Sequence, residues 1–277
     1  MKSKRYLFLL FLVPVLFLLY AHYETYNLKI TYYTISSESI PPAFSNKSIV
    51  FVSDIHHGPF FSLARVTSLV DKINALHPDI ITLGGDYVHR GNKYIIPVFN
   101  ELAKLKCEHG IYAVLGNHDH WENKKLTRQK IIENGFKDCD NKSYWVKIGE
   151  DSIKIGGVGD LWTDKQIPDS TTFDMSSQNF GILLSHNPDY LERLRGDAID
   201  LTLSGHTHGG QVTFFGLFAP ILPSHYGQKY RYGMLQSGKR TSIISSGVGT
   251  ITPPLRFFCR PEIVCLKLVR TSHEATY

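Results

Sequence analysis

Ile49-Val50-Phe51-Val52-Ser53-Asp54-Ile55-His56 is the stretch of sequence that decides the fold. Its first four residues form a continuous apolar run, which predicts a strand buried on both faces. An acidic residue and a histidine follow directly where this strand ends. Because alternate residues of an extended segment point the same way, Asp54 and His56 can offer a carboxylate and an imidazole to one site.

The same arrangement recurs along the chain. Four further predicted strands are each followed by polar residues, in the motifs Gly84-Gly85-Asp86, Gly116-Asn117-His118-Asp119, Ser185-His186 and Gly205-His206-Thr207-His208. Apolar residues at helical spacing predict helices at residues 62–76 and 96–106. In open α/β sheets, ligands bind beyond the carboxyl ends of the strands. The pattern therefore predicts an α/β fold with two packed sheets, flanking helices and one site on their shared edge.

The second half of the chain is richer in predicted strands than the first. They cover residues 144–148, 152–158, 181–184, 201–203, 211–214, 242–245 and 262–268, and an edge strand is predicted at residues 28–33.

The polar residues at the strand ends have the chemistry of metal ligands. Two divalent cations about 3.5–4 Å apart can clamp a phosphoryl group, and they need a shared carboxylate. Asp86 is the predicted bridge, because two preceding glycines allow its backbone a close approach. The full predicted set is Asp54, His56, Asp86, Asn117, His186, His206 and His208. A lone histidine at a strand end is more often structural, but five such ends together indicate a site.

In order and spacing, these motifs resemble the calcineurin-like metallophosphoesterase superfamily, over about residues 48 to 250. The resemblance implies a four-layer α/β/β/α sandwich that holds two divalent metals, with Mn²⁺ expected and Fe or Zn²⁺ as alternatives. It assigns the ligands as two sets, Asp54, His56, Asp86 and His208 for one metal, and Asp86, Asn117, His186 and His206 for the other.

The resemblance also implies catalytic residues. His118 corresponds to the family's catalytic histidine, which stabilises developing charge and protonates the leaving oxygen, with Asp119 as the partner that orients it. The segment from Asp86 to Gly91 resembles that of serine/threonine protein phosphatases. It has His89 where that group has Asp, which argues against protein phosphatase activity. Arg90 is predicted either to bind a phosphate oxygen or to form a surface ion pair.

The extended motif Ser204-Gly205-His206-Thr207-His208-Gly209-Gly210-Gln211 resembles a membrane-associated bacterial branch. That branch includes UDP-2,3-diacylglucosamine pyrophosphatases of lipid A synthesis, which release UMP. The resemblance implies a lipid-linked substrate, and the apolar residues 214–223 are suited either to acyl chains or to core packing. A broad-specificity cell-envelope phosphodiesterase is the alternative. A non-catalytic scaffold would lack ligands, whereas this chain has the full set.

The N-terminus has Lys2, Lys4 and Arg5 before an uncharged, apolar run at residues 6–21. At ~1.5 Å per residue this run is short for a ~30 Å hydrocarbon core, and a cleaved signal is the rival interpretation. The poor cleavage site favours an uncleaved anchor at residues 1–22, a tether at 23–47 and the catalytic domain at 48–277. We expect the protein to be anchored in the bacterial inner membrane by this N-terminal segment. The positive-inside rule sends the domain outward, but lipid A precursors are cytoplasmic, so the side stays open.

The composition is that of a folded globular protein, with 43% hydrophobic and 20% charged residues among 277. The net charge of +5 fits phosphates, anionic lipid or an ordinary surface. Lys/Arg-rich stretches with interleaved aromatics do not occur, so no nucleic-acid partner is expected, and we expect a monomer. The four cysteines are widely spread, which excludes a zinc pattern. Cys259 and Cys265 are either neighbours or free thiols.

Overall fold

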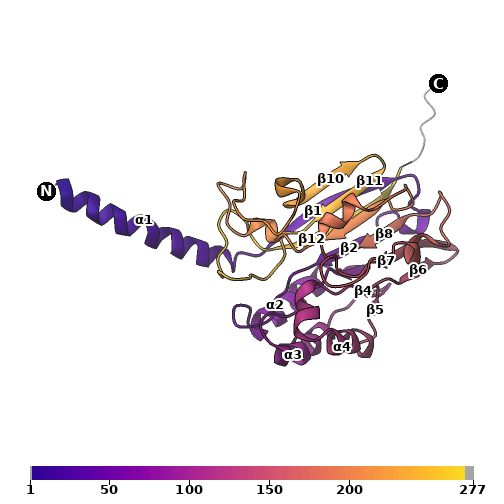
Figure 1. The fold of residues 1–277 in the computed structure, drawn as a ribbon. Coiled ribbons are helices and arrows are strands. Elements are labelled where there is room, and N and C mark those ends of the chain that lie inside the picture. Colours follow the sequence, from indigo (N-terminus) through magenta and orange to yellow (C-terminus); the bar gives the residue numbers. More distant parts are fainter. Residues whose placement is uncertain (1, 272–277) are drawn as a thin grey trace, which may run out of the picture.

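The computed structural model describes residues 2–271, with side chains from residue 10 onward. Two six-stranded sheets pack against each other, and helices cover the outer face of the first (Figure 1). The strand order is β1-β12-β2-β3-β4-β5 in the first sheet and β10-β11-β9-β8-β7-β6 in the second. The predicted mixed α/β fold with two sheets is confirmed.

The bounds of the elements are as follows. The first sheet contains β1 (Lys29–Ser37), β2 (Ser48–Val52), β3 (Ile80–Leu83), β4 (Ile111–Ala113), β5 (Lys137–Asp138) and β12 (Glu262–Arg270). The second sheet contains β6 (Ser143–Ile148), β7 (Asp151–Gly157), β8 (Gly181–Leu184), β9 (Leu201–Ser204), β10 (Gly233–Ser237) and β11 (Arg240–Ile244). The α-helices are α1 (Lys2–Glu24), α2 (Leu63–Ala75), α3 (Ile95–Leu102), α4 (Asn117–Glu133) and α5 (Asp169–Thr172).

The position of strand β2 in the sheet explains why its sequence is a continuous apolar run. Successive strand residues face opposite sides of a sheet. Val50 and Val52 pack into the core beneath the helices. Ile49 and Phe51 fill the core between the two sheets. Both faces of the strand are therefore buried, as the continuous apolar run predicted.

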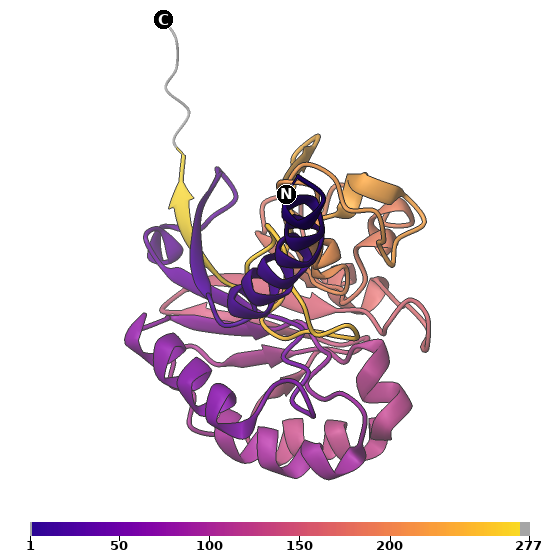
Figure 2. The same cartoon turned by 90° about the vertical axis from the view of Figure 1, so that its left-hand side faces the viewer.

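The helices α2, α3 and α4 lie together on one face of the sandwich (Figure 2). Helix α2 buries Val66, Leu69, Val70 and Ile73, which share one side of a helix. Helix α4 was not predicted, because its sequence is mostly polar. On the second sheet, helix α5 packs against β6, β7 and β8, but it has only four residues. The fourth layer is therefore thinner than the expected four-layer sandwich implies.

Two segments differ from their sequence predictions. Residues 211–214 form only isolated bridges, because Gln211 adopts a φ of 52°, which is incompatible with an extended strand. Residues 29–37, within the predicted tether, pair with β12 along their whole length. The predicted edge strand is therefore longer than expected and belongs to the first sheet. The four cysteines are free thiols.

Helix α1 leaves the body of the molecule, and only its C-terminal end packs on the sandwich (Figure 1). Among the residues whose side chains are described, no helix is long and apolar enough to cross a membrane. The predicted anchor at residues 1–22 lies partly outside this set, because the side chains of residues 1–9 are not described.

Candidate metal centre

The loops that follow β2, β3, β4, β8 and β9 meet at one edge of the sandwich, as predicted from their carboxyl ends. Backbone hydrogen bonds join these loops to one another. The amide of Asp54 donates to the carbonyl of Gly85 at 3.0 Å, and the amide of Gly205 donates to His186 at 3.0 Å. The loops therefore form one continuous scaffold.

Five of the predicted metal ligands have positive φ angles. They are Asp54 (57°), His56 (50°), Asp86 (56°), His206 (68°) and His208 (51°). Non-glycine residues rarely adopt this left-handed conformation, which costs on the order of 1–3 kcal/mol at each position. Such strain persists only where the surrounding structure enforces it, and it concentrates at functional sites.

Close packing around Asp54 explains the glycine in the motif that carries His206. A Cβ atom at Gly205 would lie 2.2 Å from Oδ2 of Asp54 and 2.0 Å from Oγ of Ser53. Only glycine lets the two ligand loops approach this closely.

Asp86 occupies the position of a shared ligand. Its Oδ2 lies 3.5 Å from Nε2 of His56 and 3.2 Å from Nε2 of His186. Its Oδ1 accepts the backbone N–H of His118 at 2.8 Å. One carboxylate oxygen therefore faces an imidazole from each predicted ligand set, while the other fixes the orientation of the carboxylate.

The first ligand set is gathered on one side of Asp86. Nε2 of His56 lies 3.0 Å from Nε2 of His208, and Oδ1 of Asp54 lies 3.4 Å from the same His208 atom. All of these side chains are buried. The structure thus brings together the residues that the sequence assigned to one metal.

In the second ligand set, a backbone carbonyl group fixes the orientation of the His186 ring. Nδ1–H of His186 donates to the carbonyl oxygen of Gly84 at 2.7 Å, which leaves Nε2 free. Nε2 of His186 faces Oδ2 of Asp86 at 3.2 Å, whereas Nε2 of His206 and Oδ1 of Asn117 are buried without a hydrogen-bond partner. Each unpaired buried polar atom costs about 1–3 kcal/mol. Divalent cations would satisfy these atoms, so the residues fit the metals that the family implies.

Electrostatics in the cluster favours the same conclusion. Burial opposes ionisation of Asp86, but the charge of His186 and its hydrogen bond to the carboxylate outweigh burial and hold the carboxyl pKa well below its ordinary value. Burial and the charge of His186 lower the pKa of His206 to about 3. An ionised carboxylate and a neutral imidazole are the forms that bind metals.

His186 is the exception to this pattern. Burial lowers its pKa, but the charges of Asp86 and Asp54 outweigh burial and raise the pKa well above its ordinary value. The proton on His186 then balances the buried carboxylates, a role that a bound cation takes over.

The side chain of Asp119 contacts backbone amides rather than the ring of His118. It was expected to orient His118, but its Oδ2 accepts the amides of Asp86 at 2.7 Å and Gly116 at 2.9 Å. Its Oδ1 accepts the amide of Tyr87 at 3.0 Å. The carboxylate therefore caps α4 and holds the loop that carries the shared ligand. The sequence could not show this, because two of the three donating amides, those of Asp86 and Tyr87, follow a different strand, β3.

His118 instead has a histidine partner. Its Nδ1 lies 3.3 Å from Nδ1 of His89, and the two ring centroids are 4.9 Å apart. Burial lowers the pKa of each ring to about 4. The two imidazoles contact each other at the edge of the cluster of predicted ligands, where His118 remains partly exposed.

Replacing Asp119 with alanine is expected to weaken metal binding by about 10–100-fold, the usual effect of losing a residue that positions ligands. The variant leaves three backbone amides without their acceptor. The melting temperature should fall together with the metal content, measured by elemental analysis. Asp119→Asn keeps one acceptor oxygen and should lose less of both. An alanine variant with full metal content would contradict this role.

Two tryptophans at the centre were missed as site residues in the sequence. The ring of Trp162 lies 4.3 Å from that of His206, and the ring of Trp121 lies 4.8 Å from that of His118. Trp162 is 45% exposed and Trp121 58%, so both can contact a substrate. Their positions a few residues beyond polar strand ends were the available signal.

Arg90 lies beside the predicted ligands and His118 rather than among them. Its exposed guanidinium is 5.7 Å from the ring centroid of Phe60, whose ring is 6.0 Å from that of His89. Its role in phosphate binding stays a prediction.

Comparisons with known proteins agree with this geometry. The profile of the calcineurin-like phosphoesterase family matches residues 47–210. An uncharacterized metallophosphoesterase of Bacillus subtilis, YkuE, is 32% identical over 91% of this chain and 90% of that protein. The phosphodiesterase YaeI of Escherichia coli is 30% identical over 80% of this chain and 82% of that protein.

Among solved structures, the NAD nucleotidase of Haemophilus influenzae superposes with a TM-score of 0.50 at 15% identity. That likeness covers 73% of this chain and 45% of that one, and it concerns the fold alone. The family profile, the full-length relatives and the ligand cluster agree. The chain belongs to the calcineurin-like phosphoesterase family and is a metal-dependent phosphoester hydrolase.

Proposed function

We propose that this enzyme hydrolyses a phosphodiester or pyrophosphate bond in a lipid-linked nucleotide, with UDP-2,3-diacylglucosamine as the first substrate to test. The observation that carries the reaction type is the Asp86 carboxylate, which faces one imidazole from each of two ligand sets. Cleavage of the proposed substrate would release UMP.

The protein's own residues have distinct tasks in this reaction. The candidate ligands would hold two cations, which when bound would supply charge neutralisation and lower the pKa of water. Asp86 sets the position of the two ligand sets relative to each other. His118 contacts His89 through Nδ1, which leaves Nε2 to donate a hydrogen bond to a substrate oxygen. His89 therefore restrains the ring that meets the leaving group.

The metals proposed are Mn²⁺, or alternatively Fe or Zn²⁺. Their preference for mixed donors matches imidazole nitrogens together with carboxylate and amide oxygens. Elemental analysis of protein purified without added metal tests this proposal.

The exposed tryptophans support a substrate with a planar group. Stacking on an aromatic side chain is worth about 1–3 kcal/mol per nucleobase. The carboxylate of Asp160 accepts the amide of Trp162 at 3.0 Å, so the loop that carries this indole is held in place.

Trp162→Ala is expected to raise KM for a uridine-linked pyrophosphate by about tenfold, since stacking of this strength corresponds to roughly a factor of ten. The value of kcat should change much less, because the indole does not contact the reacting bond. Trp145→Ala is the matched control, because Trp145 is on β6 and donates to Asp174 instead. Unchanged KM in steady-state assays of Trp162→Ala would rule out stacking on this residue.

The proposed location is the bacterial inner membrane, with residues 1–22 as the anchor. The apolar sequence of this segment and the exposure of α1 side chains such as Leu10 and Leu19 support it. Labelling an engineered exposed cysteine in intact cells determines on which side the domain lies.

A broad-specificity cell-envelope phosphodiesterase is the second candidate. It is favoured by the relative in Escherichia coli, which is named a phosphodiesterase and is 30% identical.

The decisive experiment compares two substrates with the Mn²⁺-loaded full chain. Hydrolysis of bis-p-nitrophenyl phosphate, lost on chelation of the metal, is expected for either candidate. Release of UMP from UDP-2,3-diacylglucosamine is expected only for the first. Cleavage of the generic diester without UMP release would overturn the lipid-linked assignment and leave the second candidate.

A further inference from the structure

The loop at residues 214–221, called here the apolar loop, exposes large hydrophobic side chains. Phe215 is 72% exposed, Leu217 81% and Ile221 79%, and Phe214 and Phe218 are exposed as well. A contiguous apolar surface of this kind on a folded protein usually marks an interaction site.

The backbone of the apolar loop is well held. The amide of Phe214 donates to the carbonyl of Phe218 at 2.7 Å, and the amide of Leu217 donates to Phe214 at 2.9 Å. Nη2 of Arg231 donates to the carbonyl of Gly216 at 2.7 Å. Apolar side chains outside and paired backbone groups such as these suit a hydrocarbon environment, because lipid cannot pair with free backbone groups.

Aromatic contacts join the apolar loop to α1. The ring of Phe215 lies 5.2 Å from that of Phe258, which lies 5.7 Å from the ring of Tyr20 on α1. Phe17 on α1 likewise contacts Phe257 at 4.6 Å. The loop, drawn in orange, projects on the side of the molecule from which α1 leaves (Figure 1). The loop and the helix therefore form one surface.

Helix α1 extends this apolar surface on all its sides. Its exposed hydrophobic side chains, Leu10, Phe11, Val13, Val15, Leu16, Leu18 and Leu19, are distributed around the whole helix. A helix that is apolar on all sides is typical of a protein core or a membrane, because exposing it to water is unfavourable.

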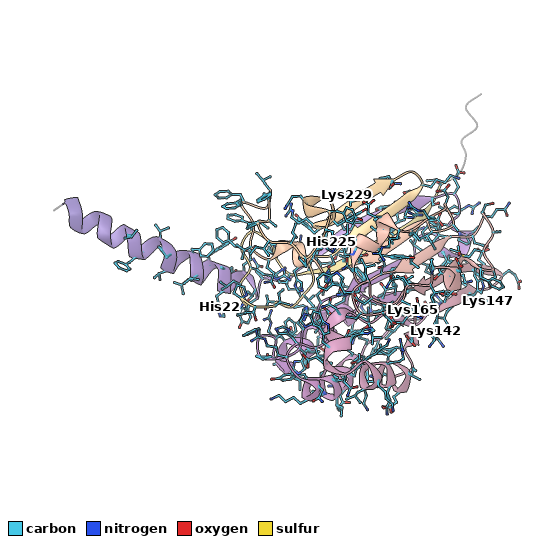
Figure 3. The ribbon with its side chains drawn as sticks, in the orientation of Figure 1. His22, Lys142, Lys147, Lys165, His225 and Lys229 are labelled. Atoms are coloured by element: carbon cyan, nitrogen blue, oxygen red, sulfur yellow. The ribbon has the colours of Figure 1, made fainter. Side chains whose placement is uncertain are left out.

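Basic residues near the apolar loop and α1 favour a negatively charged partner. Residues 201–261 contain six Lys and Arg residues and no Asp or Glu. Arg256 is buried and Lys229 pairs with Glu192, so Arg231 and Arg260 are the basic residues that border the apolar loop and α1. Arg231 holds the apolar loop, and Arg260 binds Asn27 just beyond α1. Lys229 and His225 lie on the same upper side of the molecule (Figure 3). Anionic lipid attracts each such residue near its surface by about 1 kcal/mol.

A second copy of this chain fits the surface less well. It would bring the same positive segment against itself, and like charges oppose association. A bilayer with anionic headgroups satisfies both the charge and the apolar side chains.

We propose that the apolar loop inserts into an anionic lipid bilayer beside α1, so that the loop and the helix together seat the enzyme on the membrane. The loop packs against the motif that carries His208, since a Cβ atom at Gly210 would lie 2.2 Å from Cβ of Ala219, so its insertion would bring the catalytic edge near the lipid surface. The inference rests on the proposed membrane location, and it adds a second lipid contact that does not depend on the substrate.

The test uses the full chain with vesicles of equal parts phosphatidylcholine and phosphatidylglycerol, whose acyl chains carry bromine as a fluorescence quencher. Leu217→Trp places an indole at the tip of the apolar loop. Lys147→Trp is the matched control, because Lys147 is exposed and lies at the end of the molecule opposite α1 (Figure 3). We expect the fluorescence added by Leu217→Trp to be quenched and that added by Lys147→Trp to be unaffected.

Any other result of this experiment would contradict one component of the proposal. Vesicles that carry the protein without quenching at position 217 would show that α1 binds lipid and the apolar loop does not. A protein that fails to float with the vesicles would contradict both lipid contacts. Equal quenching with phosphatidylcholine alone would contradict the role of charge. Hydrolysis of bis-p-nitrophenyl phosphate by the same samples reports separately on the proposed reaction.

Discussion

Asp86→Asn is expected to abolish stable binding of both cations and to lower kcat/KM by at least about a thousandfold. The carboxylate faces an imidazole from each ligand set, so its charge supports both sites at once. Metal ions contribute several kcal/mol to phosphoryl transfer, and about 1.4 kcal/mol corresponds to a factor of ten in rate. Elemental analysis and diester hydrolysis measure the two effects.

The matched control for this prediction is Asp138→Asn. Asp138 is also buried in the first sheet, but it pairs with Lys142 at 2.6 Å and Arg128 at 3.2 Å, away from the metal centre. Loss of that charge should lower the melting temperature and leave the metal content intact. If Asp86→Asn still bound two cations per chain, Asp86 would not be the shared ligand.

His118→Ala is expected to lower kcat by about 10²–10⁴-fold while both cations stay bound, because general acid catalysis is worth this much. The loss should be larger for an alkyl phosphodiester than for bis-p-nitrophenyl phosphate. The nitrophenolate is a good leaving group, so it needs less help from a proton donor. Steady-state kinetics with the two substrates gives both values.

His120→Ala provides the comparison for this variant. His120 is on the same helix, α4, but its Nε2 lies 3.9 Å from Asp164 rather than beside His89. Its removal should leave the dependence on the leaving group as in the unmodified protein. Equal losses with both substrates in His118→Ala would exclude a proton-donating role, and loss of metal would indicate a ligand instead.

The partners of His118 and Asp119 show why adjacent residues can have unrelated roles. Both follow β4 in one motif, and the sequence suggested that they act together. Asp119 instead caps α4 and accepts amides from the Asp86 loop. His118 contacts His89, a residue that the sequence showed only as a departure from the protein phosphatases. Which side chains meet depends on the packing of three loops, which no local pattern contains.

The sequence also did not decide whether residues 214–223 are exposed or buried. Residues 214–223 suited either acyl chains or a buried loop, because composition does not tell in which direction a side chain points. The structure shows that most of this loop is exposed, through left-handed turns at Gln211 and Phe215 and the contact of Arg231 with Gly216.

By itself, the sequence predicted the two-sheet α/β fold and the polar residues that gather at one edge of it. Both follow from local rules, since apolar runs such as residues 49–52 form buried strands and polar residues follow their carboxyl ends. Tertiary structure alone decided that one oxygen of Asp86 faces two imidazoles, that Asp119 ties loops together and that His89 restrains His118. These contacts join residues from different strand ends, so their geometry exists only once the two sheets have packed.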